Sequence, residues 1–244
     1  MADLKDSVLG KVYPYAERFG VNERLAEKGR PRAEVLEQLR QMAREEDTFW
    51  QTGKCSGTMY CGDMEHYAFL NEAFSLYSHV NALQRDMCPS ATRFEGEIIA
   101  MTLDLMHGDA VKQHHPDETA CGSVTSGGTE SIITALVTYR DKFRAERGIK
   151  APEIILPETA HPAFEKGAHL FGMEVIHAPV NPSTTQVDVD FVRAHINPNT
   201  VVLIGSAGNY PYGTIDPIAE LAEIALEHDI GLHVDGCLGG FILP

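Results

Sequence analysis

The second half of this 244-residue chain alternates short apolar runs with longer amphipathic segments, and this alternation limits the possible folds more than any other feature. The apolar runs predict strands at 153–156, 173–178, 201–204 and 230–235. The segments before and between them predict helices at 129–147, 162–171, 188–195 and 216–228. Strands that alternate with helices form mostly parallel sheets with helices on both faces. We therefore expect an α/β fold.

The first 110 residues lack this alternation, and we expect an amino-terminal helical arm at 1–110 followed by a sheet domain at 111–244. One helix is expected to open at Pro31, because proline suits the first position of a helix. Its apolar stripe follows helical spacing at Val35, Leu36, Leu39 and Met42. Two further helices are expected at 67–85 and 91–107.

Charge and cysteine content disfavour several classes of protein. The chain has 35 acidic and 20 basic side chains, and its formal charge of −15 argues against nucleic acid or an anionic bilayer as the main partner. Its apolar runs are shorter than the roughly 18 residues of a membrane helix, and its first residues lack a secretory signal pattern. Its five cysteines have no CxxC spacing, which is typical of reduced thiols. We expect a cytoplasmic protein without an integral membrane segment.

Polar residues gather at the ends of the predicted strands, where α/β sheets bind their ligands. His161 follows the first strand, Ser206 follows the third, and Asp235 ends the fourth. His233 precedes Asp235 by two residues, so both side chains face the same side of that strand. A carboxylate among apolar residues is costly unless it meets a cation. Three strand ends thus bring a histidine, a serine and an aspartate to one edge of the sheet.

Each of these residues also has a simpler interpretation. Asp235 could satisfy the loop that follows its strand, and His161 could cap the helix that begins at Pro162. A metal site built from His161, His233 and Asp235 is conceivable, yet the sequence has neither an HExxH motif nor a Cys/His cluster. We expect no metal.

A pair of glycines marks the start of the longest predicted helix, in the run Ser126-Gly127-Gly128-Thr129. The first N–H groups of a helix can hold a phosphate, and glycine lets a ligand approach the backbone closely. The alternative is a capping segment in which Glu130 closes the first turn without any ligand. The run is neither a GxxxxGK[ST] loop nor a GxGxxG fingerprint, which disfavours a nucleotide-binding Rossmann-type module.

Four blocks follow one another in a fixed order, namely SVTSGGTESI, PETAHPAFEKGAHLFGMEV, GSAGNYPYGTIDP and LHVDGCLGGFILP. Together they resemble the sphingosine-1-phosphate lyases, pyridoxal-phosphate (PLP) enzymes related to the group II amino acid decarboxylases. The upstream segments KCSGTMYCGD and NALQRDMCPSATRFEGEIIAM resemble the bacterial members in particular. The resemblance implies an aspartate aminotransferase-like fold (PLP fold type I) and a homodimer with its active site at the subunit interface.

The resemblance also implies how the cofactor, pyridoxal 5′-phosphate, would be held. Its phosphate would lie at the helix start, on Ser126, Gly127, Gly128 and Thr129. His161 would stack on the pyridine ring and shield one face. Asp235 would pair with the ring nitrogen and keep it protonated, because a pyridinium accepts electrons better than a neutral pyridine does.

Other residues would surround this cofactor. By the same resemblance, Ser206 and His233 would lie near its polar edge, in contact with it or just behind its contacts. Tyr210 would reach into the active site of the same or the neighbouring subunit. Tyr60 and His79 are candidate contacts for a phosphate group on the substrate.

The implied reaction is retro-aldol cleavage of a phosphorylated long-chain amino alcohol, such as sphingosine 1-phosphate, between Cα and Cβ. The products would be phosphoethanolamine and a long-chain aldehyde. One alternative within the same chemistry is decarboxylation of an amino acid. Another is a noncatalytic relative that binds pyridoxal phosphate, if the chain truly ends at Pro244.

The lysine that binds the cofactor covalently in this family stands well downstream of the HVDG block. Every lysine of this chain precedes that block, and none has a matching context. We therefore expect the sequence to be the amino-terminal part of a lyase, ending before that lysine and before the small carboxyl-terminal domain.

Overall fold

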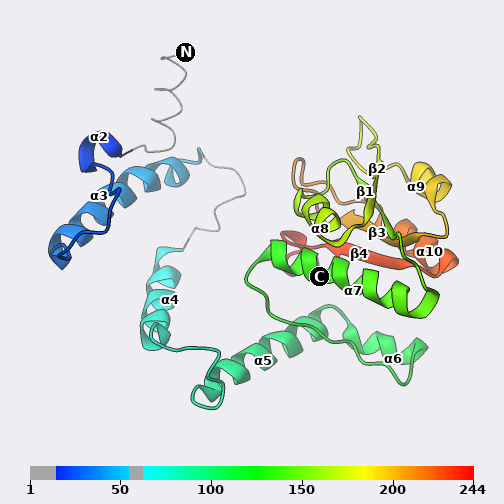
Figure 1. Cartoon of the computed structure of the whole chain (residues 1–244), viewed down its shortest axis with the longest axis horizontal. Coiled ribbons are helices and arrows are strands. Elements are labelled where there is room, and N and C mark those ends of the chain that lie inside the picture. The colour runs from blue at the N-terminus through cyan, green and yellow to red at the C-terminus, as the bar shows by residue number, and fades with distance from the viewer. Residues whose placement is uncertain (1–14, 55–62) are drawn as a thin grey trace. The chain divides into compact units, whose positions relative to one another are not determined.

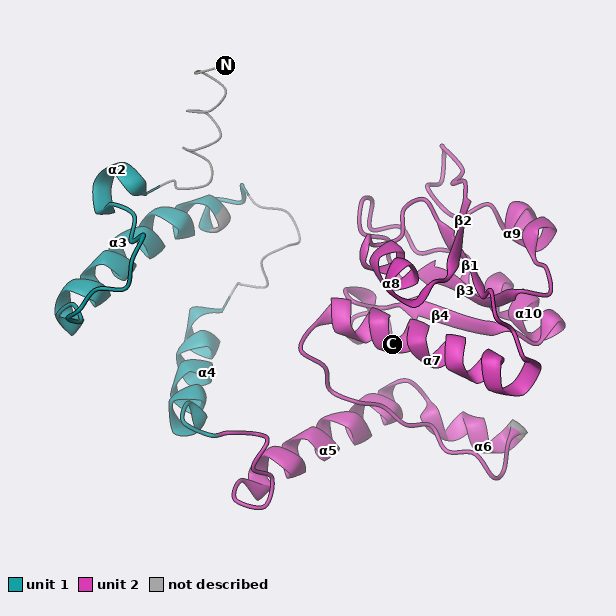
Figure 2. Ribbon diagram, in the orientation of Figure 1, with its two compact units in different colours: residues 1–80 teal, residues 81–244 magenta. Residues whose placement is uncertain are grey.

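The computed structural model describes residues 15–54 and 63–244. The chain divides into two compact units, residues 1–80 and residues 81–244 (Figure 2). Within the described ranges, no helix is both long and apolar enough to cross a lipid bilayer.

The first unit contains three described helices, α2 (Ala16–Phe19), α3 (Arg32–Gln51) and α4 (Met64–Tyr77). An ion pair between Arg18 and Glu45 joins α2 to α3. Asp63 caps α4, because its carboxylate accepts hydrogen bonds from the N–H groups of Glu65 and His66, both at 3.0 Å. This cap starts α4 three residues before the predicted position, and the helix ends at Tyr77 rather than at residue 85.

The second unit begins with helical segments that lead into the sheet. They are α5 (Pro89–Leu105), the 3₁₀ helix η1 (Gly108–Ala110) and α6 (Val111–His114). The compact units separate after Val80, and the contacts of α5 with η1 and of η1 with α6 link residues 89–114 within the second unit. The expected division at residue 110 between a helical arm and a sheet domain stays a prediction.

A four-stranded parallel sheet forms the centre of the second unit (Figure 1). Its strands are β1 (Glu153–Pro157), β2 (Glu174–Ala178), β3 (Thr200–Ser206) and β4 (Gly231–Asp235). Their spatial order is β2-β1-β3-β4, and every pair is parallel. The helices between them are α7 (Gly128–Arg147), α8 (Ala163–Phe171), α9 (Val189–His195) and α10 (Ile218–His228). This architecture confirms the predicted α/β fold.

Helices cover both faces of the sheet because alternate strand residues point to opposite sides. Ile154 and Ile204 pack on one side with α7 and α8, while Ile155 and Leu203 pack on the other side with α9 and α10. All four are nearly inaccessible to water. Each such side chain contributes about 1.5–3 kcal/mol by leaving water, so these two layers provide the main stability of the unit.

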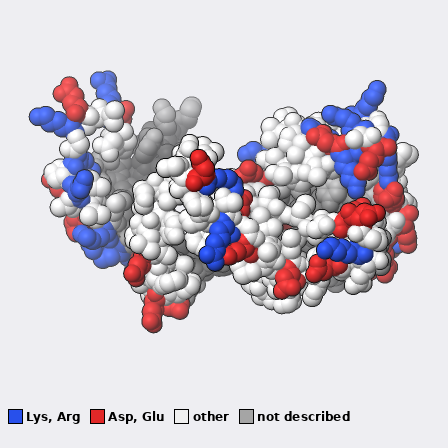
Figure 3. Space-filling view, turned by 90° about the horizontal axis from the view of Figure 1, so that it is seen from below, with Lys and Arg blue, Asp and Glu red and all other residues white. Residues whose placement is uncertain are grey.

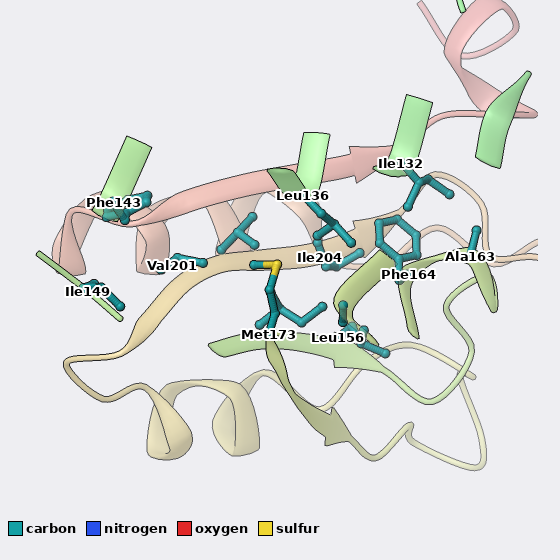
Figure 4. Packing of buried hydrophobic residues seen from close by; sticks show 13 residues of the cluster. Ile132, Leu136, Phe143, Ile149, Leu156, Ala163, Phe164, Met173, Val201 and Ile204 are labelled. Carbon is teal, nitrogen blue, oxygen red and sulfur yellow. The ribbon is translucent and has the colours of Figure 1, made fainter. Parts of the chain in front are cut away.

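Close packing between α7 and α8 depends on a glycine. A Cβ atom on Gly167 of α8 would lie 2.7 Å from Cδ1 of Leu136 on α7, which is fully buried. Figure 4 shows Leu136 in this layer, with Ile132, Ala163 and Phe164 near the ends to which the strand arrows point. The starts of α7 and α8 therefore lie at the carboxyl edge of the sheet, where the predicted site residues are placed.

Acidic and basic side chains are mixed on the surface in view in Figure 3. Several are paired in the sheet unit, including Arg147 with Asp229 and Arg193 with Glu227. Such exposed pairs contribute about 0–1 kcal/mol each, so the fold depends chiefly on its apolar layers.

Candidate active site

The start of α7 presents an open backbone surface. Gly127 is the residue before the helix and Gly128 is its first residue. A Cβ atom built on either glycine would meet no atom within 4 Å, so space for a ligand exists directly over this backbone. The first N–H groups of a helix have no carbonyl partner within it, and they attract anions.

The same segment also contains the simpler cap considered from the sequence. Oε2 of Glu130 accepts a hydrogen bond from the Ser126 N–H at 2.6 Å. Hydrogen bonding from Ser126 lowers the pKa of the Glu130 carboxyl. The hydroxyls of Thr125 and Ser131 lie 2.7 Å apart beside it. The hydrogen bond from Ser126 to Glu130 caps the helix but does not occupy the space over Gly127 and Gly128. Helix capping and phosphate binding are therefore compatible at this segment.

His161 follows β1 and is held in a defined orientation. Its Nδ1 accepts a hydrogen bond from the N–H of Ala163 at 3.1 Å, which places the proton of the neutral ring on Nε2. The histidine therefore does cap the start of α8, as the simpler interpretation predicted. Its ring also meets the ring of Tyr210 edge-on, with 5.6 Å between the centroids. The structure thus brings these two predicted site residues together.

Ser206 and Asp235 are register partners at the carboxyl ends of β3 and β4. The Ala207 N–H donates to the backbone oxygen of Asp235 at 2.8 Å, and the Cys237 N–H donates to Asp235 Oδ1 at 3.0 Å. One carboxylate oxygen of Asp235 is therefore anchored by the turn that follows β4. This geometry leaves Oδ2 to meet a cationic group.

His233 lies two residues before Asp235 on β4 and is paired in register with Ile204. Its ring meets Phe164 edge-on at 5.4 Å between centroids. Burial lowers the pKa of His233, and the negative charge of Asp235 opposes this shift. The imidazole is therefore neutral near pH 7.

A cavity of about 350 Å³ lies between His233 and residues of α7 and the loop before it, and His233 is the one predicted site residue of the described chain that lines it. Hydroxyl groups dominate its lining, which comprises Ser123, Thr125, Ser131, Thr134, Ala135, Thr138, Tyr139 and His233. A second cavity of about 490 Å³ lies around residues 100–120. Of the predicted site residues that the structure describes, none lines this second cavity, so it is separate from the strand ends.

Two predicted substrate contacts are not placed at this edge. Tyr60 lies outside the described residues. His79 belongs to the first unit, whereas the predicted site residues from Ser126 to Asp235 belong to the second. The roles of Tyr60 and His79 therefore stay predictions.

Two buried polar residues at the strand ends were not among the predicted site residues. Thr159, two residues before His161, is 5% exposed, and its Oγ1 has no hydrogen-bond partner among the described residues. Asp216 is 2% exposed and accepts two backbone hydrogen bonds. In the sequence, Asp216 stands before a proline and a helix, so it resembles an ordinary helix-start residue. Only the structure shows that its carboxylate is buried and bonded to two other segments of the chain.

The residues at this edge fit an aromatic phosphate ester. The open helix start suits a phosphate, the Asp235 carboxylate suits a protonated ring nitrogen, and His161 supplies a flat ring at the next strand end. The partnerless Thr159 hydroxyl adds a buried polar group beside them. The donor set is thus compatible with pyridoxal phosphate.

Comparison with known proteins decides the family. Residues 14–244 match the family model described as "Pyridoxal-dependent decarboxylase conserved domain". The chain belongs to this family. Pyridoxal phosphate, which the sequence resemblance implied, is accordingly its cofactor.

Proteins named sphingosine-1-phosphate lyase are similar to the chain. A sphingosine-1-phosphate lyase of Arabidopsis thaliana is 44% identical over 214 residues, which are 86% of this chain and 38% of that protein. The structure of a Burkholderia pseudomallei sphingosine-1-phosphate lyase is 61% identical, with a TM-score of 0.91, over 95% of this chain and 53% of that chain. The resemblance to bacterial lyases is thereby confirmed. The chain spans about half the length of the Burkholderia protein and less than half the length of the Arabidopsis protein.

A more distant structure supports the fold alone. The glutamate decarboxylase domain of a Vibrio parahaemolyticus enzyme is 24% identical, with a TM-score of 0.75, over 94% of this chain and 51% of that chain. Together with the Burkholderia structure, it confirms the expected PLP fold type I.

Proposed function

We propose that the whole protein containing this chain is a pyridoxal-phosphate-dependent lyase. Its substrate would be a long-chain base 1-phosphate, cleaved between Cα and Cβ to give phosphoethanolamine and a long-chain aldehyde. The observation that carries this proposal is the 61% identity to the Burkholderia lyase over 95% of the chain. The decarboxylase domain from Vibrio has the same fold at 24% identity and therefore does not favour its own reaction here.

In this proposal, the residues at the sheet edge bind and orient the cofactor. The start of α7 binds the phosphate, and Asp235 keeps the ring nitrogen protonated. When bound, the protonated ring accepts the electrons that are released as the substrate bond breaks. His161 covers one face of the ring, and its Nε2–H is free to donate because Nδ1 is occupied by the Ala163 N–H.

Tyr210 is proposed to reach the substrate side of this cofactor. Its side chain is 72% exposed, and its ring edge lies against His161. An exposed tyrosine beside a site suits contact with a ligand or with another subunit. Tyr60 and His79 are proposed to contact the substrate phosphate. The lysine that binds the cofactor covalently is proposed to belong to a part of the whole protein outside this chain, since no lysine here has the family context.

We also propose a homodimer with the active site at the subunit interface. Helix α4 leaves Phe69 64% exposed, Phe74 71% exposed and Leu76 66% exposed. Large apolar side chains on one helix favour burial against another protein surface. Light scattering of the purified whole protein tests this arrangement, with twice the chain mass expected and a monomer at micromolar concentration arguing against it.

Product analysis tests the reaction. The whole protein, loaded with pyridoxal phosphate, is incubated with sphingosine 1-phosphate, and a long-chain aldehyde and phosphoethanolamine are expected in equal amounts. Parallel incubations contain glutamate or an aromatic amino acid. The family description favours decarboxylation as the second candidate, so release of CO2 without aldehyde would replace the lyase proposal.

A spectroscopic control separates an enzyme from a noncatalytic binder. Covalently bound pyridoxal phosphate absorbs near the visible edge, and borohydride removes both this band and the activity. A protein that shows the band but forms no product from either class of substrate would be a noncatalytic relative.

A further inference from the structure

Asp216 is a buried carboxylate that bonds to two separate segments of the chain. Its Oδ2 accepts from the Ser206 N–H at 2.8 Å, and its Oδ1 accepts from the Val187 N–H at 3.0 Å. The Asp216 N–H donates back to the Ser206 backbone oxygen at 2.9 Å. Burial raises the pKa of Asp216, and the hydrogen bonds from Ser206 and Val187 oppose this shift. Because both oxygens accept N–H groups, the arrangement suits the ionised carboxylate.

These bonds complete the end of β3. The register of β3 with β1 ends at Leu203, so the sheet gives Ser206 no partner on that side. On the other side, the Ala207 N–H already bonds to Asp235. Asp216 thus replaces a neighbouring strand for Ser206, with its carboxylate as acceptor and its N–H as donor.

Three further hydrogen bonds join residues 185–186, next to Val187, to the loop between Ser206 and Asp216. The hydroxyls of Thr185 and Thr214 lie 2.6 Å apart, and Nδ2 of Asn209 donates to the Thr185 backbone oxygen at 3.1 Å. Nε2 of Gln186 donates to the Ile215 backbone oxygen at 2.8 Å. Residues 207–215 are therefore held at both ends and along their length.

The segment held in this way carries Tyr210. Asn209 closes a turn around it, because its N–H donates to the Thr214 oxygen and its own oxygen accepts from the Gly213 N–H, both at 2.7 Å. Asn209 is 2% exposed, whereas Tyr210 is 72% exposed and lies edge-on to His161. The buried residues fix the turn, and the tyrosine projects from it.

We propose that Asp216 is a positioning residue, whose carboxylate holds the 207–215 loop to the end of β3 and thereby places Tyr210 against His161. That Tyr210 matters for activity rests on the proposed function. That Asp216 holds the loop rests on the hydrogen bonds alone. Within the described residues, the side-chain hydrogen bonds of Asp216 go to Ser206 and Val187 and not to His161 or Asp235, so it acts through the loop.

Asp216→Asn removes one of the two accepting atoms while it keeps the shape of the side chain. The amide nitrogen cannot accept, so either the Ser206 or the Val187 N–H loses its partner. Hydrogen exchange followed by mass spectrometry on the purified whole protein measures the result. Amides of residues 207–215 are expected to exchange at least about 10-fold faster, because the loop opens without global unfolding.

Ile224→Val is the matched control for stability. Ile224 lies on α10, is fully buried in the layer beneath the sheet, and makes no hydrogen bond to the loop through its side chain. It is expected to lower the melting temperature without faster exchange in 207–215. If Asp216→Asn does not fold, Thr214→Val removes only the hydroxyl contact with Thr185, and a smaller acceleration in the same loop is expected.

A double-mutant cycle on kcat/KM tests the connection to Tyr210 in the holoenzyme. Asp216→Asn is expected to lower kcat/KM at least about 10-fold alone, and less than about 3-fold in the Tyr210→Phe background, because coupled residues do not act additively. Equal fold-losses in both backgrounds would overturn the proposal. Unchanged exchange in 207–215 would overturn it as well.

The outcomes distinguish this inference from the proposed function. A wild-type protein that forms no aldehyde contradicts the lyase proposal, yet the exchange experiment still tests whether Asp216 holds the loop. A wild-type protein that forms aldehyde, with unaltered loop exchange in Asp216→Asn, leaves the lyase intact and removes the positioning role.

Discussion

Ser206 and Asp235 stand directly opposite each other as the last register pair of β3 and β4. The adjoining Ala207 N–H bonds to the Asp235 backbone oxygen, and the Cys237 N–H bonds to its carboxylate. The position of this carboxylate is therefore set by backbone on two sides. As a result, a change of its charge can be studied without moving the strand end.

Asp235→Asn is expected to keep the fold and lower turnover. The amide oxygen can still accept the Cys237 N–H, but a neutral amide does not keep the pyridine nitrogen protonated. We expect kcat of the whole protein to fall by about two orders of magnitude or more, with cofactor still bound. Steady-state kinetics and the absorption spectrum measure both quantities. Asp190→Asn, at an exposed position in the first turn of α9, should behave as wild type; near wild-type turnover in Asp235→Asn would contradict the assigned role.

Gly128→Ala is expected to weaken cofactor binding without harming the fold. A Cβ atom at this position meets nothing within 4 Å, and alanine favours a helix by up to about 1 kcal/mol over glycine. The added methyl group would occupy the space proposed for the phosphate, so the dissociation constant of pyridoxal phosphate should rise at least about 10-fold. Equilibrium dialysis and thermal melting measure the two effects.

Gly122→Ala provides the control for this experiment. Its Cβ atom would make an ordinary contact at 3.6 Å with Ile99 of α5. We expect unchanged cofactor affinity in this variant. Unchanged affinity in Gly128→Ala as well would place the phosphate elsewhere.

Gly239→Ala and Gly240→Ala form a matched pair in the turn after β4, which contains the 3₁₀ helix η2 (Gly239–Phe241). A Cβ atom on Gly239 would overlap the Ala207 backbone oxygen, whereas one on Gly240 would lie 3.7 Å from Cε of Met106. The first change must move the backbone beside Asp235, and we expect it to lower the melting temperature and cofactor affinity. Gly240→Ala should do neither, and equal effects of both would show that the close approach to Ala207 is unimportant.

The sheet was predictable because short apolar runs, typical of buried strands, alternate along the chain with segments whose apolar residues follow helical spacing. The strand expected at 201–204 spans 200–206, and its last residue is Ser206. Hydrophobic periodicity could not include it, because Gly205 and Ser206 are not apolar. Their burial depends on β4 and on Asp216, which are distant in the sequence.

The candidate site was partly predictable for a related reason. Residues at the ends of parallel strands share one edge, so Ser206 and Asp235 could be placed together from the strand assignments. The contact of His161 with Tyr210 depends on the loop that carries Tyr210, and the sequence does not specify loop geometry. Asp216 was missed because its two acceptor bonds join segments that no local pattern connects.

His233 predicts how stability depends on pH. Burial lowers its pKa in the folded state below the ordinary value of 6.5, with Asp235 opposing the shift. As pH falls below 6.5, the unfolded chain therefore binds a proton before the folded chain does, and stability decreases. This contribution is fully present above pH 6.5 and is lost as pH falls through the lower, folded pKa.

His233→Gln should accordingly reduce the difference in urea midpoint between pH 7.5 and pH 5.5, because glutamine does not titrate. The sign is the decisive feature: a His233→Gln protein that loses more stability than wild type over this interval would mean that the folded state favours the protonated ring. In that case, the charge of Asp235 would outweigh burial, and the neutral imidazole assigned to His233 would be wrong.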